Sequence, residues 1–316
     1  MDSTTRIIAT DDDGITQAAG ILRAGGLVAF PTETVYGLGA DARNGTAVAA
    51  IYEAKGRPSF NPLIVHVPDI EHARRYIAWS ETTDRIAAAF WPGPLSIVAP
   101  LRDGHGLSSL VTAGLPTVAI RVPAHPVARA LLAAFDGPVA APSANPSGRI
   151  SPTRPAHVRD GLSGRIDAIV DGGACPVGLE STILGVSDQQ VTLLREGGIS
   201  AERVEALLAA SLHRHGENDT LNAPGQMGSH YAPGAAVRLN ARKAANDEVM
   251  LGFGDVPGTL NLSQSGDLAE AAANLFEYLH RLDATGAPIA VAPIPETGLG
   301  RAINDRLRRA AAPRES

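Results

Sequence analysis

Small hydroxyl groups and cations gather at the points where apolar runs of this sequence end. The run "GGLVAF" is followed by "PTETVYGLGADA" (31–42), with two threonines around a glutamate, a tyrosine and two glycines. Loops at the ends of buried strands often carry binding groups on a rigid scaffold. We therefore expect residues 31–42 to form a binding loop, in which Thr34 offers a hydroxyl group.

A second stretch, "KGRPSFNPLIVHV" (55–67), places Lys55 and Arg57 two positions apart. In an extended segment such residues point to the same side, and two converging cations suit a polyphosphate. A solvated helix end is the alternative, but prolines stiffen the segment and an apolar strand follows at once. His66 lies within that strand, where a histidine is usually just packed; here it could face the same cavity as Thr34.

Arg121 stands in the middle of the apolar run "TVAIRVP", where an unpaired charge would be costly. It needs an anion, which is either an internal carboxylate such as Glu33 or Glu180, or a bound ligand. The stretch alone favours the two alternatives equally. Thr117 precedes Arg121 by four residues and falls on the same face of the predicted strand.

Three more strand ends carry polar groups, although each could be an ordinary turn or surface residue. "PVAAPSANPSGRISPT" (138–153) is dense in hydroxyl groups and backbone donors of the kind that hold phosphate or ribose oxygens. Ligands of α/β sheets bind at strand ends. The recurrence predicts an anion-binding α/β enzyme with a nucleotide as the expected ligand, and adds these candidates: Ser143, Asn145, Ser151, Ser181 and Arg195.

Helical and strand patterns alternate along the chain, which predicts a largely wound, mixed α/β sheet. Helices are expected at 12–26, 45–57, 82–94, 126–135, 199–215, 267–282 and 298–311. Residues 213–235 lack an apolar period and predict a linker. The expected domains are therefore 1–212, the linker 213–235, and a small second α/β unit, 236–316.

The composition narrows the class of protein. The chain has 316 residues, 44% hydrophobic and 19% charged, with a formal net charge of −6, so the whole molecule is not drawn to nucleic acid, although a local basic patch stays open. One cysteine, Cys175, excludes an intrachain disulfide and a cysteine-based zinc site, and is expected to be a turn residue and not a nucleophile. No apolar run approaches about 20 residues, and no signal-peptide pattern opens the chain, so a soluble, cytoplasmic protein without membrane contact is predicted.

Taken in order, "PTETVYGLGADA", "KGRPSFNPLIVHV", "FWPGPLSIV", "GLPTVAIRVP", "APSANPSG" and "GLESTI…LREG" resemble the YrdC-type threonylcarbamoyl-AMP synthases. The linker's "APGQMGSHYAP" and the unit after it resemble the longer, two-domain form, so the likeness covers nearly the whole chain. It implies a twisted, mixed α/β sheet with a concave binding cavity and a small Rossmann-like C-terminal domain. It also implies that the linker covers the cavity.

The resemblance implies that L-threonine, bicarbonate and ATP give threonylcarbamoyl-AMP and pyrophosphate, with Mg²⁺ on the phosphates. A separate transferase then moves the threonylcarbamoyl group to the adenosine beside the anticodon of ANN-decoding tRNAs; whether tRNA itself is contacted stays open. The residues implied to hold threonine are Thr34, His66, Arg121, the backbone at Ala141, and Ser181. Those implied to hold ATP are Arg57, Asn61, Thr117, Ser143, Ser151, Arg195 and Tyr231, with Lys55 and Asn145 assigned to phosphate contacts. Lys55, Arg57 and Arg121 are the expected catalytic cations.

One departure from the family concerns the linker, where "QMGS" replaces the lysines and aromatic residues that often precede "HYAP". Because His230 and Tyr231 remain, we expect the covering role to persist. Two other functions compete with the synthase. A non-catalytic double-stranded-RNA-binding YrdC module is disfavoured by the acidic net charge and few aromatic residues. A carbamoyl-adenylating enzyme of hydrogenase maturation would need zinc-binding cysteines that one cysteine cannot supply.

Overall fold

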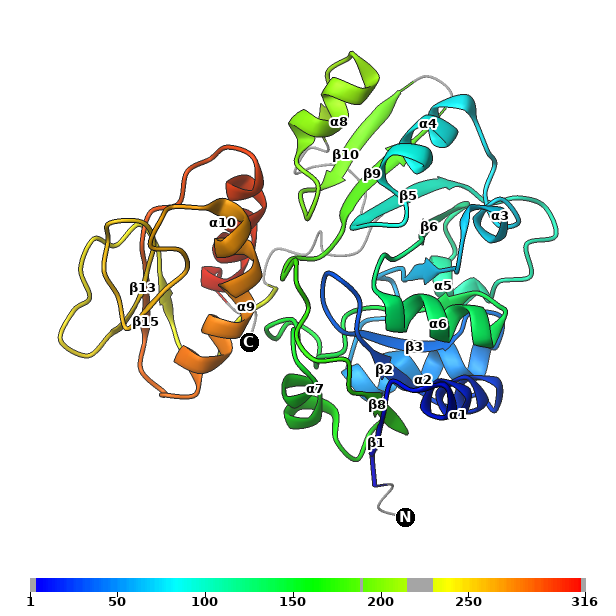
Figure 1. Ribbon diagram of the computed structural model, residues 1–316, viewed down its shortest axis with the longest axis horizontal. Helices are drawn as coiled ribbons and strands as arrows, with labels where there is room; N and C mark the ends of the chain where they lie inside the picture. Colours follow the sequence, from blue (N-terminus) through cyan, green and yellow to red (C-terminus); the bar gives the residue numbers. More distant parts are fainter. Residues whose placement is uncertain (1–3, 188–189, 215–229, 314–316) are drawn as a thin grey trace.

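Two β-sheets organise the chain in the computed structural model, which describes residues 4–187, 190–214 and 230–313 (Figure 1). Within these residues the larger sheet has eleven strands and contains both parallel and antiparallel pairs, so the predicted mixed α/β sheet is confirmed. Its order is β1 (Arg6–Ile8), β8 (Ala168–Val170), β2 (Val28–Phe30), β3 (Gly37–Asp41), β7 (Val139–Ala140), β4 (Ile64–His66), β6 (Thr117–Arg121), β5 (Leu95–Pro100), β9 (Thr182–Val186), β10 (Val191–Arg195) and β11 (His213–Arg214).

Helices between these strands begin at side-chain caps that the sequence supplies. Asp11 accepts from the backbone N–H of Gly14 at the start of α1, and Asn44 and Ser80 cap α2 and α4 in the same way. Helix α1 packs against α6 (Figure 1). The helices of this unit are α1 (Asp12–Arg23), α2 (Gly45–Lys55), α3 (Ile70–Ala73), α4 (Glu81–Phe90), α5 (Ser109–Thr112), α6 (Pro126–Phe135), α7 (Pro155–Leu162) and α8 (Ala201–Leu208).

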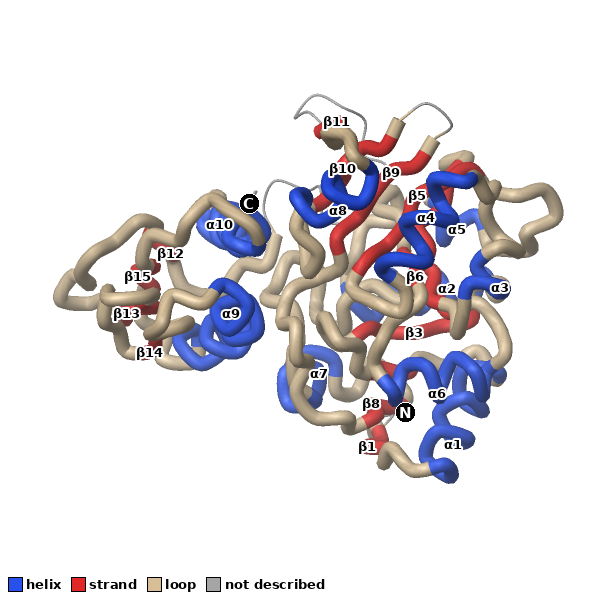
Figure 2. Tube along the Cα trace, turned by 45° about the horizontal axis from the view of Figure 1, so that its top comes forward, coloured by secondary structure: helices blue, strands red, loops and turns tan. Residues whose placement is uncertain are grey.

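The second unit is a four-stranded sheet whose strand pairs are all parallel, as a Rossmann-like unit requires. Its strand order is β12 (Val237–Arg238), β15 (Ile289–Val291), β13 (Val249–Gly252) and β14 (Leu260–Asn261). Helices α9 (Leu268–Asp283) and α10 (Leu299–Ala311) lie on the side of this sheet that faces the larger unit (Figures 1 and 2). They therefore supply side chains that meet the larger unit.

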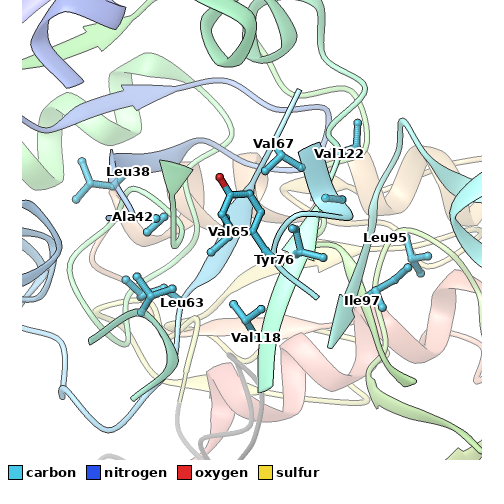
Figure 3. Packing of buried hydrophobic residues seen from close by; sticks show 14 of the residues in the cluster. Leu38, Ala42, Leu63, Val65, Val67, Tyr76, Leu95, Ile97, Val118 and Val122 are labelled. Atoms are coloured by element: carbon cyan, nitrogen blue, oxygen red, sulfur yellow. The ribbon is translucent and has the colours of Figure 1, made fainter. Parts of the chain in front are cut away.

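The main core fills one face of the central strands. Figure 3 shows Val65 of β4, Val118 of β6 and Leu95 and Ile97 of β5 packed together. Successive side chains of a strand point to opposite faces, so Ile64 and His66 lie on the other face, as do Ala119 and Arg121. That other face carries a small apolar cluster of Ile64, Val98, Ala119 and Ile183.

Three expectations about the elements are corrected. Residues 31–42 are not one loop, because Gly37–Asp41 form β3, which pairs antiparallel with β2. The segment around Lys55 is not extended, because helix α2 runs to Lys55 and ends at Gly56, whose φ is 58°. The helix expected at 199–215 ends at Leu208, where Ala209 adopts a left-handed conformation and returns its N–H to the carbonyl of Glu205.

The larger sheet also extends into the segment predicted as linker. His213–Arg214 form β11, which pairs with β10. Residues 215–229, which include His215 and Gln226–Ser229 of the predicted cover, lie outside the described residues. The described part of the linker resumes at His230, whose N–H donates to the carbonyl of Arg309 (3.3 Å), and Ala232 N–H donates to the carbonyl of Gly148 (2.8 Å).

Candidate functional site

A cavity lies on the face of the larger sheet opposite the main core. About 560 Å³ of space, including solvent open to the outside, is free of protein atoms there, and strand ends, the loop after β2 and the segment at His230 form its walls. Nine predicted site residues from seven separate stretches line this one cavity: Thr34, Arg57, His66, Arg121, Ala141, Ser143, Ser181, Arg195 and Tyr231.

Thr32 shapes the loop that presents Thr34 to the cavity. Its hydroxyl oxygen accepts from the backbone N–H groups of Thr34 (3.2 Å) and Val35 (3.3 Å), and its proton goes to the carbonyl of Val35 (2.7 Å). The hydroxyl oxygen of Thr34 lies 2.7 Å from the hydroxyl oxygen of Thr32 and accepts from Nη1 of Arg121 at 2.9 Å. With the proton of Thr32 already committed, Thr34 donates to Thr32, and a lone pair of the Thr34 hydroxyl remains for a ligand.

The charge of Arg121 is balanced inside the protein. Its Nη2 lies 2.5 Å from Oε1 of Glu33, and both side chains are buried. Burial by itself would raise the pKa of Glu33, but the charge and hydrogen bond of Arg121 hold that pKa below its usual value. Of the two carboxylates considered from the sequence, Glu33 is therefore the partner and Glu180 is not.

Arg121 nevertheless keeps hydrogen-bonding capacity on the cavity. Its Nε donates to the carbonyl of Gly93 (3.2 Å), so three of the five N–H bonds of the guanidinium are used by Gly93, Thr34 and Glu33. Two remain for a ligand as far as the described residues go. A bound carboxylate is thus compatible with Arg121, but it is not needed to explain why the arginine is buried.

His66 offers a neutral imidazole to the cavity. Burial, with the nearby Arg121 charge, lowers the pKa of His66 to about 3. Its Nδ1 is buried and has no hydrogen-bond partner among the described residues, while the ring packs edge-on against Phe30. A buried polar atom without a partner is costly, so Nδ1 of His66 is suited to a polar group of a ligand.

Arg57 is a buried cation whose described partners are neutral. Its Nε donates to the carbonyl of Asn61 (3.4 Å) and its Nη2 to the carbonyl of Pro62 (3.1 Å). Burial lowers its pKa to about 10, which still leaves it charged at neutral pH. No acid forms an ion pair with Arg57 in the described ranges, so its charge is available to an anion in the cavity.

Arg195 is also buried, which excludes the surface role considered for it. Its Nη2 donates to the carbonyl (2.9 Å) and the hydroxyl oxygen (3.1 Å) of Ser181. The Ser181 hydroxyl in turn lies 2.8 Å from that of Ser96. Arg195 therefore fixes the start of β9 and adds a third guanidinium group to the cavity wall.

Lys55 is buried but does not line the cavity. Its Nζ donates to the carbonyl of Ser143 (2.6 Å) and to that of Asn145. Burial, with repulsion from Arg57, lowers its pKa well below the usual value. Lys55 therefore stabilises the loop of Ser143 and Asn145. Arg57 lines the cavity and Lys55 does not, so the two cations do not converge on it as expected.

Asn61, Thr117, Asn145 and Ser151 also lie outside the cavity lining. Asn145 donates to the carbonyls of Pro146 and Arg149, and its Oδ1 is buried without a partner among the described residues. Thr117 and Arg121 stand at opposite ends of β6, about 13 Å apart at the rise of a strand. They cannot hold the same chemical group.

Sequence reasoning missed the residue that joins the two units at the cavity. Glu180 lines the cavity, where its Oε1 accepts from the Ser151 hydroxyl and its Oε2 from Nε of Arg306 at 2.9 Å. Thr32 was also missed as a cavity residue, although it lies two positions before Thr34, and His230, expected only as part of the cover, lines the cavity as well. No local pattern signals Arg306, which lies 126 positions from Glu180.

The described residues contain no group of three or more metal-ligating side chains, so they do not fit a protein-held metal ion. The carboxylate of Glu180 is already bonded at both oxygens. Burial raises the pKa of the Cys175 thiol to about 12, which keeps it protonated and unsuited to be a nucleophile. In the same described ranges, each helix is too short or too polar to cross a bilayer.

The fold and the cavity together define an α/β protein with three buried arginines in the lining of one cavity. Two family models match the chain: the Sua5_yciO_yrdC family, described as "Telomere recombination", over residues 20–197, and "Threonylcarbamoyl-AMP synthase, C-terminal domain" over residues 199–312. The chain belongs to the Sua5/YrdC family, in its form with the additional C-terminal domain.

Individual relatives agree over nearly the full length. The chain is 41% identical to the threonylcarbamoyl-AMP synthase of Bacillus subtilis, covering 97% of this chain and 95% of the relative. It is 40% identical to that of Pyrococcus abyssi, covering 93% of each. Among solved structures, P. abyssi Sua5 complexed with L-threonine matches with a TM-score of 0.90 and 37% identity, over 97% of this chain and 98% of the other.

Proposed function

We propose that this protein is an L-threonylcarbamoyladenylate synthase, a nucleotidyltransferase that joins L-threonine, bicarbonate and ATP into threonylcarbamoyl-AMP and releases pyrophosphate. The observation that carries the proposal is a single cavity that places Thr34, His66 and Arg121 together with Arg57 and Arg195. Relatives with this function span nearly the same length, and the structural neighbour named above is a complex with L-threonine.

The threonine half of the cavity is formed by Thr34, His66, Arg121, Ser181 and the backbone at Ala141. The two open N–H bonds of Arg121 suit the substrate carboxylate, because a guanidinium binds a carboxylate in a two-point manner. The lone pair of Thr34 and the Nδ1 atom of His66 suit the substrate amine and hydroxyl. Both lie beside Arg121 at the carboxyl end of its strand.

The nucleotide half contains Arg57, Ser143, Arg195 and Tyr231 at the cavity, with Lys55, Asn61, Thr117, Asn145 and Ser151 around it. Ile64, Ala119 and Ile183 belong to an apolar cluster on the sheet face that carries Arg121. Ala119 is the middle residue of β6. Of these three residues Ile64 lines the cavity, where an apolar side chain suits a nucleobase, while the arginines suit the phosphates. Thr117, about 13 Å from Arg121, fits a contact at the far end of ATP.

The chemistry requires positioning and charge neutralisation but no covalent enzyme intermediate. The threonine amine attacks bicarbonate, water leaves, and a carbamate forms. A carbamate oxygen then attacks the α-phosphorus of ATP, and the bond to pyrophosphate breaks. Holding the two anions together and stabilising negative charge on the leaving group are the contributions expected of the protein. Arg57 and Arg195 are the cavity cations that we assign to the phosphates.

Mg²⁺ enters this proposal only as the counter-ion of ATP, because the described residues form no metal site. We also propose bicarbonate as co-substrate and a separate transferase that consumes the unstable product and modifies tRNA in the cytoplasm. The domain boundaries 1–212, 213–235 and 236–316 stay predictions. So does a direct tRNA contact.

Threonine selectivity tests the assignment of the cavity. Valine matches threonine in shape but lacks the hydroxyl group. A site that hydrogen-bonds this hydroxyl group binds an amino acid without it more weakly. We expect calorimetry to show binding of L-threonine and at least about tenfold weaker binding of L-valine. In a Thr34→Val protein the preference for threonine should fall. Equal binding of the two amino acids by the unchanged protein would contradict the proposal.

A further inference from the structure

A carboxylate stands in the wall of a cavity that otherwise favours anions. Glu180 is the single acidic residue among the described lining residues, beside Arg57, Arg121 and Arg195. A free negative charge there would repel ATP. Glu180 is not free, because Ser151 donates to its Oε1 and Arg306 donates to its Oε2 at 2.9 Å.

Arg306 reaches Glu180 from the other structural unit. It belongs to α10, is fully buried, and does not line the cavity. Asp305 accepts from its Nη1 at 2.8 Å, and its guanidinium carbon lies 5.3 Å from the centre of the Tyr231 ring. Burial opposes the charge of Arg306, but Tyr231, Glu180 and Asp305 raise its pKa above the usual value, so the guanidinium stays charged.

We propose that Arg306 is a positioning residue of the active site: it neutralises Glu180 and so keeps the nucleotide half of the cavity receptive to ATP. This inference rests on the proposed function. Without Arg306, Glu180 would lose the ion-pair partner that the described residues give it. Its negative charge would then repel the phosphates of ATP.

The arrangement also limits what Ser151 can do. Its hydroxyl has one proton, and that proton is donated to Glu180. The oxygen of Ser151 can therefore only accept a hydrogen bond from ATP. A ribose hydroxyl or the amino group of the base can donate such a bond, whereas a phosphate oxygen cannot.

Other ion pairs also join the two units. Arg154 and Glu277 bridge the units at 2.8 Å, and Arg301 bonds Glu196 at 3.3 Å. These pairs are partly exposed, unlike Arg306, and none of them lines the cavity. The distinctive property of Arg306 is that its partner, Glu180, borders the ligand space.

The test compares Arg306→Met, Arg306→Lys, the double variant Arg306→Met/Glu180→Gln, and Arg308→Met in the full-length protein. Arg308 lies on the same helix but is exposed and pairs with Glu296, so its variant is the matched control. The readouts are kcat and KM for ATP and for threonine, together with calorimetric binding of ATP alone. Thermal unfolding checks that each protein is folded.

Arg306→Met should raise the KM for ATP about tenfold or more, because it leaves a buried acid unpaired. The KM for threonine should change less than about twofold, since a KM change reports the substrate whose binding is lost. Arg306→Lys keeps the charge and should recover most of the affinity for ATP, and so should the double variant, which removes both charges. Arg308→Met should match the unchanged protein.

The inference is overturned if the double variant binds ATP no better than Arg306→Met, or if both KM values rise together. If Arg306→Met does not fold, Arg306→Lys and the double variant are each compared with the unchanged protein. Loss of ATP binding in both of them would contradict the inference. Failure of the proposed function looks different, because the unchanged protein would then release no pyrophosphate in response to threonine. Calorimetric ATP binding would still test Arg306 in that case.

Discussion

At the scale of single residues, the cavity is built from buried polar groups whose capacity is only partly used. Arg121 spends three N–H bonds on Gly93, Thr34 and Glu33. His66 keeps Nδ1 without a partner in the part of the chain that the structure describes. Such groups are costly for folding, and they are found where a ligand completes their hydrogen bonds.

The burial of His66 predicts a pH dependence of stability. Its pKa falls from 6.5 in a solvated state to about 3 in the fold. Because the unfolded chain binds the proton more readily, the contribution of His66 is complete above pH 6.5 and is lost as the pH falls towards 3. One pH unit below 6.5, the loss amounts to about 1.4 kcal/mol.

Urea unfolding near pH 8 and pH 5.5 measures this effect. In His66→Gln the free energy of unfolding should fall about 1.4 kcal/mol less between the two pH values than in the unchanged protein. His213→Gln replaces an exposed histidine and should preserve the original dependence. An equal response in the two variants would show that His66 is not the titrating group.

Residue types at strand ends were predictable from the sequence, but the directions of their side chains were not. Thr34, His66 and Arg121 stood out because polar residues interrupt apolar runs. The direction of the Lys55 side chain was not predictable, because an extended segment was assumed there and Lys55 is instead the last residue of α2. The Glu180–Arg306 pair had no local signal, since its members are 126 positions apart and meet only when two units pack.

At the scale of elements, one loop brings α9 against the wall of the cavity. A Cβ atom at Gly178 would lie 2.4 Å from the carbonyl oxygen of Ala272 and 2.6 Å from the Cα of Ala273, both in α9. The φ of Gly178 is +72°, a conformation that favours glycine. Glu180 follows two residues later, so the spacing between α9 and this loop also sets the position of Glu180.

Gly178→Ala should therefore displace α9 and weaken ATP binding. Gly173→Ala provides the control, because Gly173 in the same loop has a φ of +75° but a Cβ there would meet nothing within 4 Å. Both variants should lose about 1 kcal/mol to backbone strain. Only Gly178→Ala should lose more than this and raise the KM for ATP.

Urea unfolding and steady-state kinetics of the two glycine variants make the comparison. Equal losses of stability with an unchanged KM for ATP in both would show that close contact with α9 does not matter to the cavity.

The sequence predicted the helices with clear apolar stripes, such as α1, α2, α6 and α9. It did not predict β3, because "GLGAD" has no alternating pattern and small residues there allow close packing: a Cβ at Gly39 would lie 2.9 Å from Val139. It also overran α8, since "SLHRH" continues a helical composition after Ala209 has already turned the chain. At both places the observed backbone departs from what the local residue pattern indicates.

At the scale of the whole molecule, the C-terminal unit packs behind residues that line the cavity. Tyr231 lines the cavity, and its ring contacts Phe276 of α9 and lies near Arg306 of α10. Its φ of 60° is unfavourable for an aromatic residue and is maintained by this packing. The formal net charge of −6 does not prevent anion binding, because the three cavity arginines set the local potential.

The central claim is that threonine and ATP react in this cavity, and pyrophosphate release tests it most directly. Release is measured with ATP, Mg²⁺ and bicarbonate on adding L-threonine, L-serine or no amino acid, for the unchanged protein and for Arg57→Met, whose described partners are only carbonyls. The account predicts strong release with threonine, less with serine, and a loss of at least about 100-fold in a folded Arg57→Met protein. Release that ignores threonine, or no release while double-stranded RNA is bound, would contradict it.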